Sequence, residues 1–127
     1  MISVGEPAPD FTLPDQGGQE VSLSDFKGHR VLLVFYPLDF SPVCSDQLTL
    51  YRDIDPQLKE AGVTPLGISV DSAFAHKAFQ DHLGIETTLL ADFEPKGAVA
   101  SAYGAYLDGA GHSNRSLVLI DAEGKVE

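Results

Sequence analysis

Positive charge and cysteine are both scarce in this sequence, and each shortage limits what the protein can do. Eight Lys and Arg residues stand against 19 Asp and Glu residues, which gives a formal net charge of −11 at pH 7. Nucleic-acid binding needs clustered Lys and Arg against phosphates, so we expect no nucleic-acid partner. The acidic residues are spread along the chain, which favours solubility as their role and disfavours a bulky anionic substrate.

A single cysteine, Cys44, is present among 127 residues, so no disulfide can form within the chain. The first residues lack the basic patch and apolar core of an export signal. No apolar run approaches the roughly 20 residues that a membrane-spanning helix needs. We therefore expect a cytoplasmic protein in a reducing compartment, with no membrane partner.

Hydrophobic runs and turn-forming residues predict an alternation of strands and helices after an N-terminal β-hairpin at residues 11–13 and 21–23. The later elements predicted are a helical turn at 24–28, a strand at 31–36, a helix from about Pro42 to Ala61, a strand at 63–70, a helix begun by Asp71 or Ser72 and ended by Gly84, a strand at 87–91, a short helix at 95–103, a strand at 116–121 and the first residues of another at 125–127. This order predicts a thioredoxin-like α/β sandwich with a mixed central sheet, formed by one domain over residues 1–127. Because the last strand has barely begun, we expect the domain to be truncated, with a C-terminal strand and helix missing.

The helix that ends at Gly84 is predicted to bury one face, made of Phe74, Ala78, Phe79 and Leu83. The aromatic residues of the second half are predicted to belong to the core or to an interface. They are Phe74, Phe79, Phe93, Tyr103 and Tyr106.

Cys44 lies where a buried strand gives way to a helix. Ser41 is the natural N-cap residue, Pro42 fits the first helical position, and Cys44 takes the third. Free N–H groups and the helix dipole stabilise a thiolate there, so we expect a lowered pKa for the thiol. The helix end alone contributes roughly 0.3–1 kcal/mol, which is less than one pKa unit, so a nearby cation should contribute more.

Arg115 is the best candidate for that cation. It opens the strand at 116–121, which should neighbour the strand at 31–36, and the guanidinium fork suits the recognition of an anion. Arg52, on the Cys44 helix, is a second candidate. The alternatives are that Arg115 is an ordinary surface charge and that Cys44 is an inert buried thiol.

These residues carry a resemblance to a known family. Pro37-Leu38-Asp39-Phe40-Ser41-Pro42-Val43-Cys44 matches the P-x-x-x-(T/S)-x-x-C signature of the peroxiredoxins. Segments 5–13, 90–93, 97–104 and 114–121 also resemble that family, so the resemblance covers essentially the whole chain. Within the family, the sequence most resembles the one-cysteine, alkyl hydroperoxide reductase E-like subgroup.

The resemblance implies a thiol peroxidase. The Cys44 thiolate would attack the terminal oxygen of a hydroperoxide and become a sulfenic acid, and water or an alcohol would leave. Pro37 would shield the sulfur, and Ser41 would hydrogen-bond the peroxide oxygen. Arg115 would lower the thiol pKa and stabilise the charge on the leaving oxygen. Gln47, one turn after Cys44, would orient Arg115.

The resemblance also implies partners. Because the chain has no second cysteine, an external thiol must recycle Cys44: a low-molecular-weight thiol, a glutaredoxin-like protein or thioredoxin. The family implies a homodimer. We expect no cofactor, since Gly109 and Gly111 form no phosphate-binding pattern between a strand and a helix. We also expect no metal, because the histidines do not form a ligand set; they are His29, His76, His82 and His112.

Two other functions remain open at the level of the sequence. The run from Ser41 to Cys44 imitates a C-x-x-C box whose first cysteine is replaced, which is compatible with a thioredoxin-like thiol oxidoreductase without peroxidase activity. A non-enzymatic holdase or interaction module is the third hypothesis. Pro37 and Arg115 favour the peroxidase.

Overall fold

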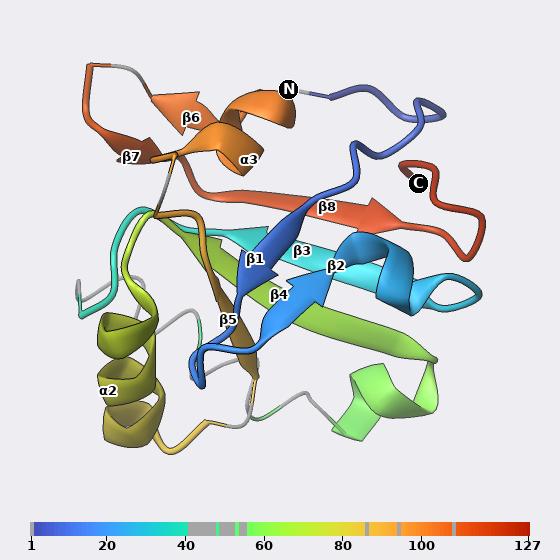
Figure 1. Cartoon of the computed structure of the whole chain (residues 1–127). Helices are drawn as coiled ribbons and strands as arrows, with labels where there is room; N and C mark the ends of the chain where they lie inside the picture. Colours follow the sequence, from blue (N-terminus) through green and yellow to red (C-terminus); the bar gives the residue numbers. More distant parts are fainter. Residues whose placement is uncertain are drawn as a thin grey trace.

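The computed structural model describes residues 2–40, 48, 53, 56–85, 87–93, 95–107 and 109–127 (Figure 1). Its elements are β1 (Thr12–Pro14), β2 (Glu20–Ser22), the 3-10 helix η1 (Leu23–Phe26), β3 (Arg30–Phe35), β4 (Val63–Ser69), α2 (Ala73–Leu83), β5 (Thr88–Ala91), α3 (Ala98–Ala102), β6 (Tyr106–Leu107), β7 (His112–Ser113) and β8 (Ser116–Ile120). Of the helix predicted over 42–61, positions 48 and 53 and residues 56–60 are helical.

In the described part of the chain, the central sheet has four strands in the order β5-β4-β3-β8. β3 pairs with β4 in parallel, and β4 pairs with β5 in parallel, whereas β8 runs antiparallel to β3. The sheet is therefore mixed, as the sequence predicts. The predicted adjacency of the 116–121 strand and the 31–36 strand is confirmed by pairs such as Leu33 with Val118.

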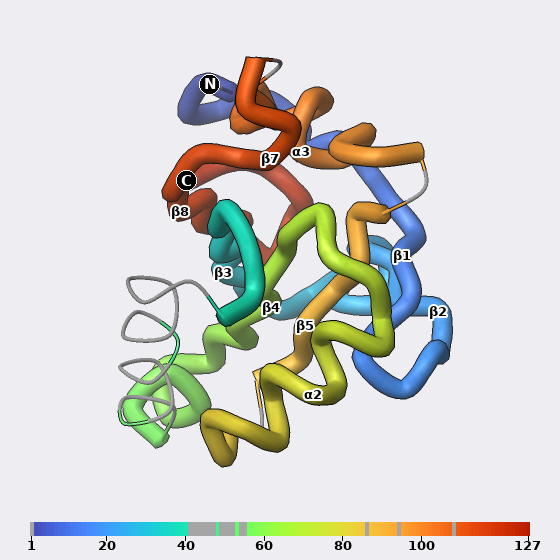
Figure 2. Tube along the Cα trace, turned by 90° about the vertical axis from the view of Figure 1, so that its left-hand side faces the viewer, coloured from blue at the N-terminus to red at the C-terminus, as the bar shows by residue number. Residues whose placement is uncertain are grey.

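β3 is covered on both faces, which explains its continuous apolar sequence. Val31, Leu33 and Phe35 contribute to a core that includes residues of the N-terminal hairpin and α3. Val34, one position out of phase, belongs to a second core with Phe79 of α2. Figure 2 shows the hairpin and α3 on one side of the sheet, with α2 and residues 56–60 on the other.

The N-terminal hairpin forms as predicted, with Leu13 opposite Val21. Its turn is organised by Asp15, whose Oδ1 accepts from the backbone N–H groups of Gly17 and Gln19, both at 2.9 Å. Gly18 takes a φ of 82°, which glycine adopts without steric cost. The turn thus fixes the register that places Leu13 in the core.

The buried face of α2 differs from the predicted one. Phe74 is 90% exposed and Ala78 is exposed, whereas His76 and Phe79 are fully buried. The helix turns its His76, Phe79 and Leu83 side toward the sheet, which is the i, i+3, i+7 spacing of an amphipathic helix. The prediction was wrong for Phe74 and Ala78 because it assigned the stripe by hydrophobicity and left out a histidine.

Residues that follow the parallel strands accept hydrogen bonds from N–H groups in the first turns of α2 and α3. Ser72 caps α2, its Oγ accepting from the N–H of Ala75 at 3.2 Å, so the choice between Asp71 and Ser72 falls on Ser72. Asp92 accepts from the N–H groups of Val99 and Ala100 at the start of α3. Burial raises the pKa of Asp92, and these two hydrogen bonds oppose the rise.

The last elements are shorter than predicted. α3 spans Ala98–Ala102, inside the predicted 95–103. Phe93 is 54% exposed, so of the two places predicted for it, core and interface, the core is excluded. After β8 the chain turns at Asp121, and Val126 forms an isolated antiparallel bridge with Ile120. In the ranges given above, no helix has the length and hydrophobicity to cross a membrane.

Candidate functional site

One edge of the central sheet holds the two described residues of the predicted site, Pro37 and Arg115. The parallel strands β3, β4 and β5 all end at this edge, and β8, being antiparallel, begins there. In open α/β sheets, ligands bind outside the carboxyl ends of the strands. Pro37 follows the end of β3, and Arg115 immediately precedes β8. The structure therefore brings Pro37 and Arg115, 78 positions apart in sequence, to the same edge.

Arg115 is held in place through its neighbours. The last pair between the two strands is Phe35 with Ser116, so Arg115 lies one position beyond it, beside Tyr36. The Ser113 hydroxyl donates to the backbone oxygen of Tyr36 at 2.8 Å. The Ser116 hydroxyl donates to Oδ1 of Asn114. The backbone on both sides of the exposed Arg115 is thus anchored, while its side chain reaches solvent.

Pro37 is half-buried and begins the loop that leads into the cysteine motif. Ser41, Cys44 and Gln47, and the second candidate cation Arg52, lie outside the described residues. Their roles, and those of Pro37 and Arg115, stay predictions.

Phe40, the residue before Ser41, has an unusual backbone. Its φ is 67°, in the left-handed region that bulky residues rarely occupy. Its ring packs against Phe79, with ring centroids 5.0 Å apart, and against His82 at 5.6 Å. Strained backbone persists only where surrounding structure imposes it, and such residues cluster at functional sites.

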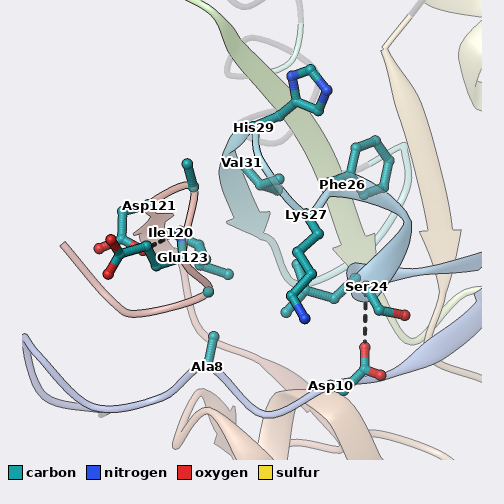
Figure 3. A pocket seen from close by; sticks show the side chains of 13 residues that line it. Ala8, Asp10, Ser24, Phe26, Lys27, His29, Val31, Ile120, Asp121 and Glu123 are labelled. Carbon is teal, nitrogen blue, oxygen red and sulfur yellow. Dashed lines mark hydrogen bonds between the residues drawn. The ribbon is translucent and has the colours of Figure 1, made fainter.

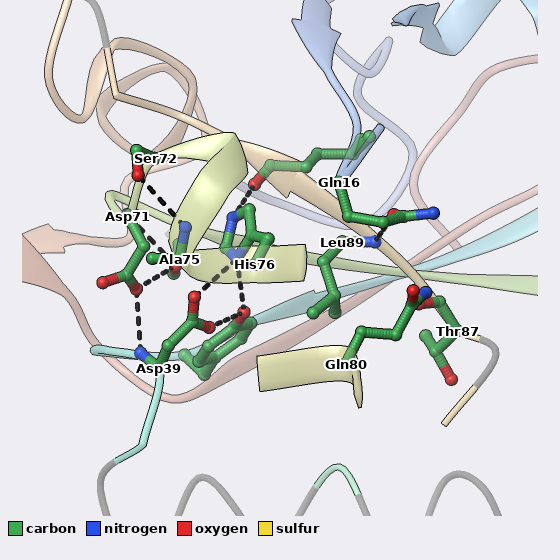
Figure 4. Close-up of polar contacts among 12 residues, drawn as sticks. Gln16, Asp39, Asp71, Ser72, Ala75, His76, Gln80, Thr87 and Leu89 are labelled. Carbon is green, nitrogen blue, oxygen red and sulfur yellow. Dashed lines mark hydrogen bonds and ion pairs between the residues drawn. The ribbon is translucent and has the colours of Figure 1, made fainter. Parts of the chain in front are cut away.

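A buried polar cluster lies beneath this loop (Figure 4). The Tyr36 hydroxyl donates to Oδ1 of Asp39 at 2.6 Å. Oδ2 of Asp39 lies 2.8 Å from Nδ1 of His76, and the side chains of the pair are 1% and 0% exposed. Nε2 of His76 lies 2.9 Å from the carbonyl oxygen of Leu90 on β5. Asp39 and His76 thus join the loop, α2 and β5.

Asp71 extends the cluster to the end of β4. Its Oδ2 accepts from the backbone N–H of Asp39 at 2.8 Å and from the Ser69 hydroxyl at 2.6 Å. Burial, and after it the charge of Asp39, raises the pKa of Tyr36 well above its ordinary value. Tyr36 therefore stays protonated and remains a hydrogen-bond donor to Asp39.

This cluster was not predicted from the sequence. Asp39 appeared there only as part of the cysteine motif, and His76 only among the histidines that form no metal-ligand set. The available signal was the position of His76, three residues before Phe79 on the apolar face of a helix. Asp39, Asp71 and His76 each offer a ligand atom within 4.8 Å of the others, but hydrogen bonds already account for their arrangement.

A pocket of about 260 Å³ lies at the other end of β3 (Figure 3). Val31, Ile120 and Phe26 form part of its apolar wall, and Lys27 and Glu123 contribute charge. Since Val31 stands at the start of β3 and Pro37 follows its end, this pocket is separate from the edge that holds Arg115.

Comparisons with known proteins show the family of this chain. Residues 4–127 match the AhpC/TSA family. An alkyl hydroperoxide reductase E from Mycobacterium tuberculosis is 42% identical over 125 residues, which cover 98% of this chain and 82% of that protein. The peroxiredoxin Bcp of Escherichia coli is 38% identical over 135 residues, which cover 99% of this chain and 83% of that protein.

The fold is similar as well. The crystal structure of AhpC from Enterococcus faecalis matches with a TM-score of 0.91 at 29% identity, covering 100% of this chain and 79% of that one. The crystal structure of peroxidoxin BcpB from Mycobacterium tuberculosis matches with a TM-score of 0.88 at 30% identity, covering 99% and 83%. The predicted thioredoxin-like fold is thereby confirmed.

These relatives favour the peroxidase over a thiol oxidoreductase without peroxidase activity. A hydroperoxide substrate and a thiol reductant follow from the same relatives, and the single cysteine fits the one-cysteine type. The chain belongs to the AhpC/TSA family and is a peroxiredoxin, a thiol-dependent peroxidase.

Proposed function

We propose that Cys44 is the nucleophile of this peroxidase and that Pro37, Ser41 and Arg115 complete its site. The observation that carries the proposal is the pairing of β8 with β3, which sets Arg115 beside the strand end from which the Pro37–Cys44 motif departs. A cation there favours the thiolate and the charge that develops on the leaving oxygen. Gln47 is proposed to orient Arg115.

The proposed reaction runs in two parts. The Cys44 thiolate attacks the terminal oxygen of the hydroperoxide, a sulfur–oxygen bond forms and the oxygen–oxygen bond breaks. The sulfur is oxidised by two electrons, and the leaving oxygen takes a proton and departs as water or an alcohol. An external thiol then attacks the sulfenic acid and releases water, and a second thiol frees the Cys44 thiolate from the mixed disulfide.

The charge of the protein bears on its substrates and partners. A net charge of −11 disfavours anionic substrates, so we propose hydrogen peroxide and uncharged organic hydroperoxides. We further propose that the protein is cytoplasmic and forms a homodimer in which each subunit is a single peroxiredoxin domain. The family resemblance supports the dimer, and sedimentation velocity tests it. A low-molecular-weight thiol, a glutaredoxin-like protein or thioredoxin is proposed as the reductant.

The test of the site is a single-turnover oxidation of the reduced protein with hydrogen peroxide, followed by trapping of the sulfenic acid on Cys44. We expect Arg115→Ala to lower the oxidation rate constant by about 10²–10³-fold, the usual effect of removing a group that stabilises developing charge. Arg115→Lys should recover only part of the rate, because lysine supplies a charge without the guanidinium fork.

Arg30 provides a matched control. It is the first residue of β3, at the end opposite Arg115, and it forms an exposed ion pair with Glu127 at 2.8 Å. Arg30→Ala should leave the oxidation rate within about 2-fold of the wild type, since exposed ion pairs contribute little. Equal rates for Arg115→Ala and Arg30→Ala would show that Arg115 is not part of the site. If wild-type Cys44 is oxidised no faster than free cysteine, Cys44 is not the peroxidase nucleophile.

A further inference from the structure

The loop from Pro37 to Phe40 makes side-chain and backbone contacts with several other segments of the protein. The Asp39 side chain contacts His76 of α2, and the Asp39 backbone N–H donates to Asp71 after β4. The Phe40 ring packs on Phe79 of α2. These contacts hold Asp39 and Phe40, the two residues that immediately precede Ser41 in the sequence.

The hydrogen bonds of His76 define where its protons are. The Leu90 carbonyl oxygen only accepts, so Nε2 of His76 must carry a hydrogen. Nδ1 lies 2.8 Å from a carboxylate oxygen, which also only accepts, so a proton lies between His76 and Asp39. The Tyr36 hydroxyl is committed to the other oxygen of Asp39. The buried pair therefore shares one proton and has no net charge.

The surroundings of the pair make that neutrality important. Among the described residues, the groups that face it are the Tyr36 hydroxyl from the end of β3, the Leu90 carbonyl from β5 and, through the Asp39 backbone, the carboxylate of Asp71. Phe79 lies one turn along α2 from His76 and offers no charge. Without His76, the carboxylate of Asp39 would have no cationic partner among the described residues of this cluster. Asp39 stands five positions before Cys44 in the sequence, and a negative charge there disfavours a thiolate.

We propose that Asp39 and His76 are positioning residues for the peroxidase reaction, which hold the loop before Ser41 and prevent the Asp39 carboxylate from opposing the Cys44 thiolate. The proposal rests on the assignment of Cys44 as the nucleophile. It concerns two residues that act through the cysteine motif and do not themselves touch the substrate.

The first test is the pH at which half of Cys44 is thiolate, measured by the pH dependence of alkylation with iodoacetamide. His76→Gln leaves Asp39 without its shared proton. We expect this midpoint to rise by about 1 unit. At a pH below both midpoints, the peroxide oxidation rate should then fall about 10-fold, since one unit changes the thiolate fraction by that factor there.

Two further variants separate charge from structure. In Asp39→Asn, the amide oxygen still accepts from Tyr36 and the amide nitrogen donates to neutral His76, so the midpoint should stay within about 0.3 units of the wild type. The double variant with Asp39→Asn and His76→Gln lacks the unpaired carboxylate and should return toward that value. A purely structural role would damage the double variant at least as much as His76→Gln and would leave the midpoint unchanged.

Asp81→Asn is the matched control, because it removes a carboxylate from the same helix at an exposed i, i+4 pair with Lys77. It should change neither the midpoint nor the rate.

A His76→Gln protein that is folded, as judged by circular dichroism, and has the Cys44 midpoint of the wild type would overturn the inference. If His76→Gln does not fold, Asp39→Ala is compared with Asp39→Asn. Both variants lack the carboxylate, but the alanine variant also loses the contacts with Tyr36 and His76 that hold the loop. We therefore expect oxidation to be about 10-fold slower only in the alanine variant, and equal rates would overturn the inference. Slow oxidation of the wild type itself would instead count against the proposed nucleophile.

Discussion

Tyr36 and Tyr103 show how the charge of the acceptor changes the contribution of a buried hydrogen bond to stability. Both are fully buried and both donate at 2.6 Å, Tyr36 to the carboxylate of Asp39 and Tyr103 to the carbonyl oxygen of Pro9. Burial raises the pKa of both phenols, which therefore stay protonated as donors. A hydrogen bond to a charged group contributes more than one between neutral groups.

Replacing each tyrosine by phenylalanine tests this difference. We expect Tyr36→Phe to lower the free energy of unfolding by about 1.5–3 kcal/mol and Tyr103→Phe by about 0.5–1.5 kcal/mol. Urea denaturation at pH 7 measures both. An equal loss for the two variants would show that the Asp39 carboxylate adds nothing to the bond with Tyr36.

At the scale of elements, α2 links the fold to the site. Its buried face carries Phe79, which packs in the core formed with β3, and His76, which binds the loop after β3. Phe74, one turn before Ala78 on the same helix, is 90% exposed. Two phenylalanines five positions apart therefore contribute very differently to stability.

We predict that Phe79→Ala lowers the free energy of unfolding by about 3–5 kcal/mol, because it leaves a cavity in the core. Phe74→Ala should change it by at most about 0.5 kcal/mol, as is usual for exposed positions. Thermal or urea unfolding of both variants checks the orientation of α2. Comparable losses in the two variants would mean that the helix does not present Phe79 to the sheet.

At the scale of the whole molecule, one sheet separates two cores while the surface carries a large excess of negative charge. The hairpin and α3 cover one face, and α2 covers the other. The net charge of −11 makes the compact state repel itself. Salt shortens the range of this repulsion, from a Debye length of about 30 Å at 0.01 M to about 8 Å at 0.15 M.

We therefore expect the thermal midpoint of unfolding at pH 7 to rise when sodium chloride is increased from about 0.01 M to about 0.15 M, because screening weakens the repulsion between the negative charges. Differential scanning calorimetry measures the midpoint, and potassium chloride serves as a control for effects specific to sodium. A midpoint that falls with both salts would mean that attractive ion pairs outweigh the overall repulsion.

The sequence by itself determined the elements and the motif. Hydrophobic runs are local, so the strand after Arg30, the N-terminal hairpin and the mixed sheet were all predictable, and the spacing from Pro37 to Cys44 indicated the chemistry. The approach of Arg115 to the end of β3 was also predictable, because an arginine that opens a strand follows that strand to its place in the sheet.

Only the tertiary structure decided which side of α2 is buried and what Asp39 does. Hydrophobicity placed Phe74 inside and did not rank His76, since a histidine is buried only where partners at both ring nitrogens compensate its desolvation. Those partners, Asp39 and Leu90, come from other segments, 37 positions before and 14 positions after His76. A local sequence pattern cannot predict such partners, because they meet only when the loop, α2 and β5 pack together.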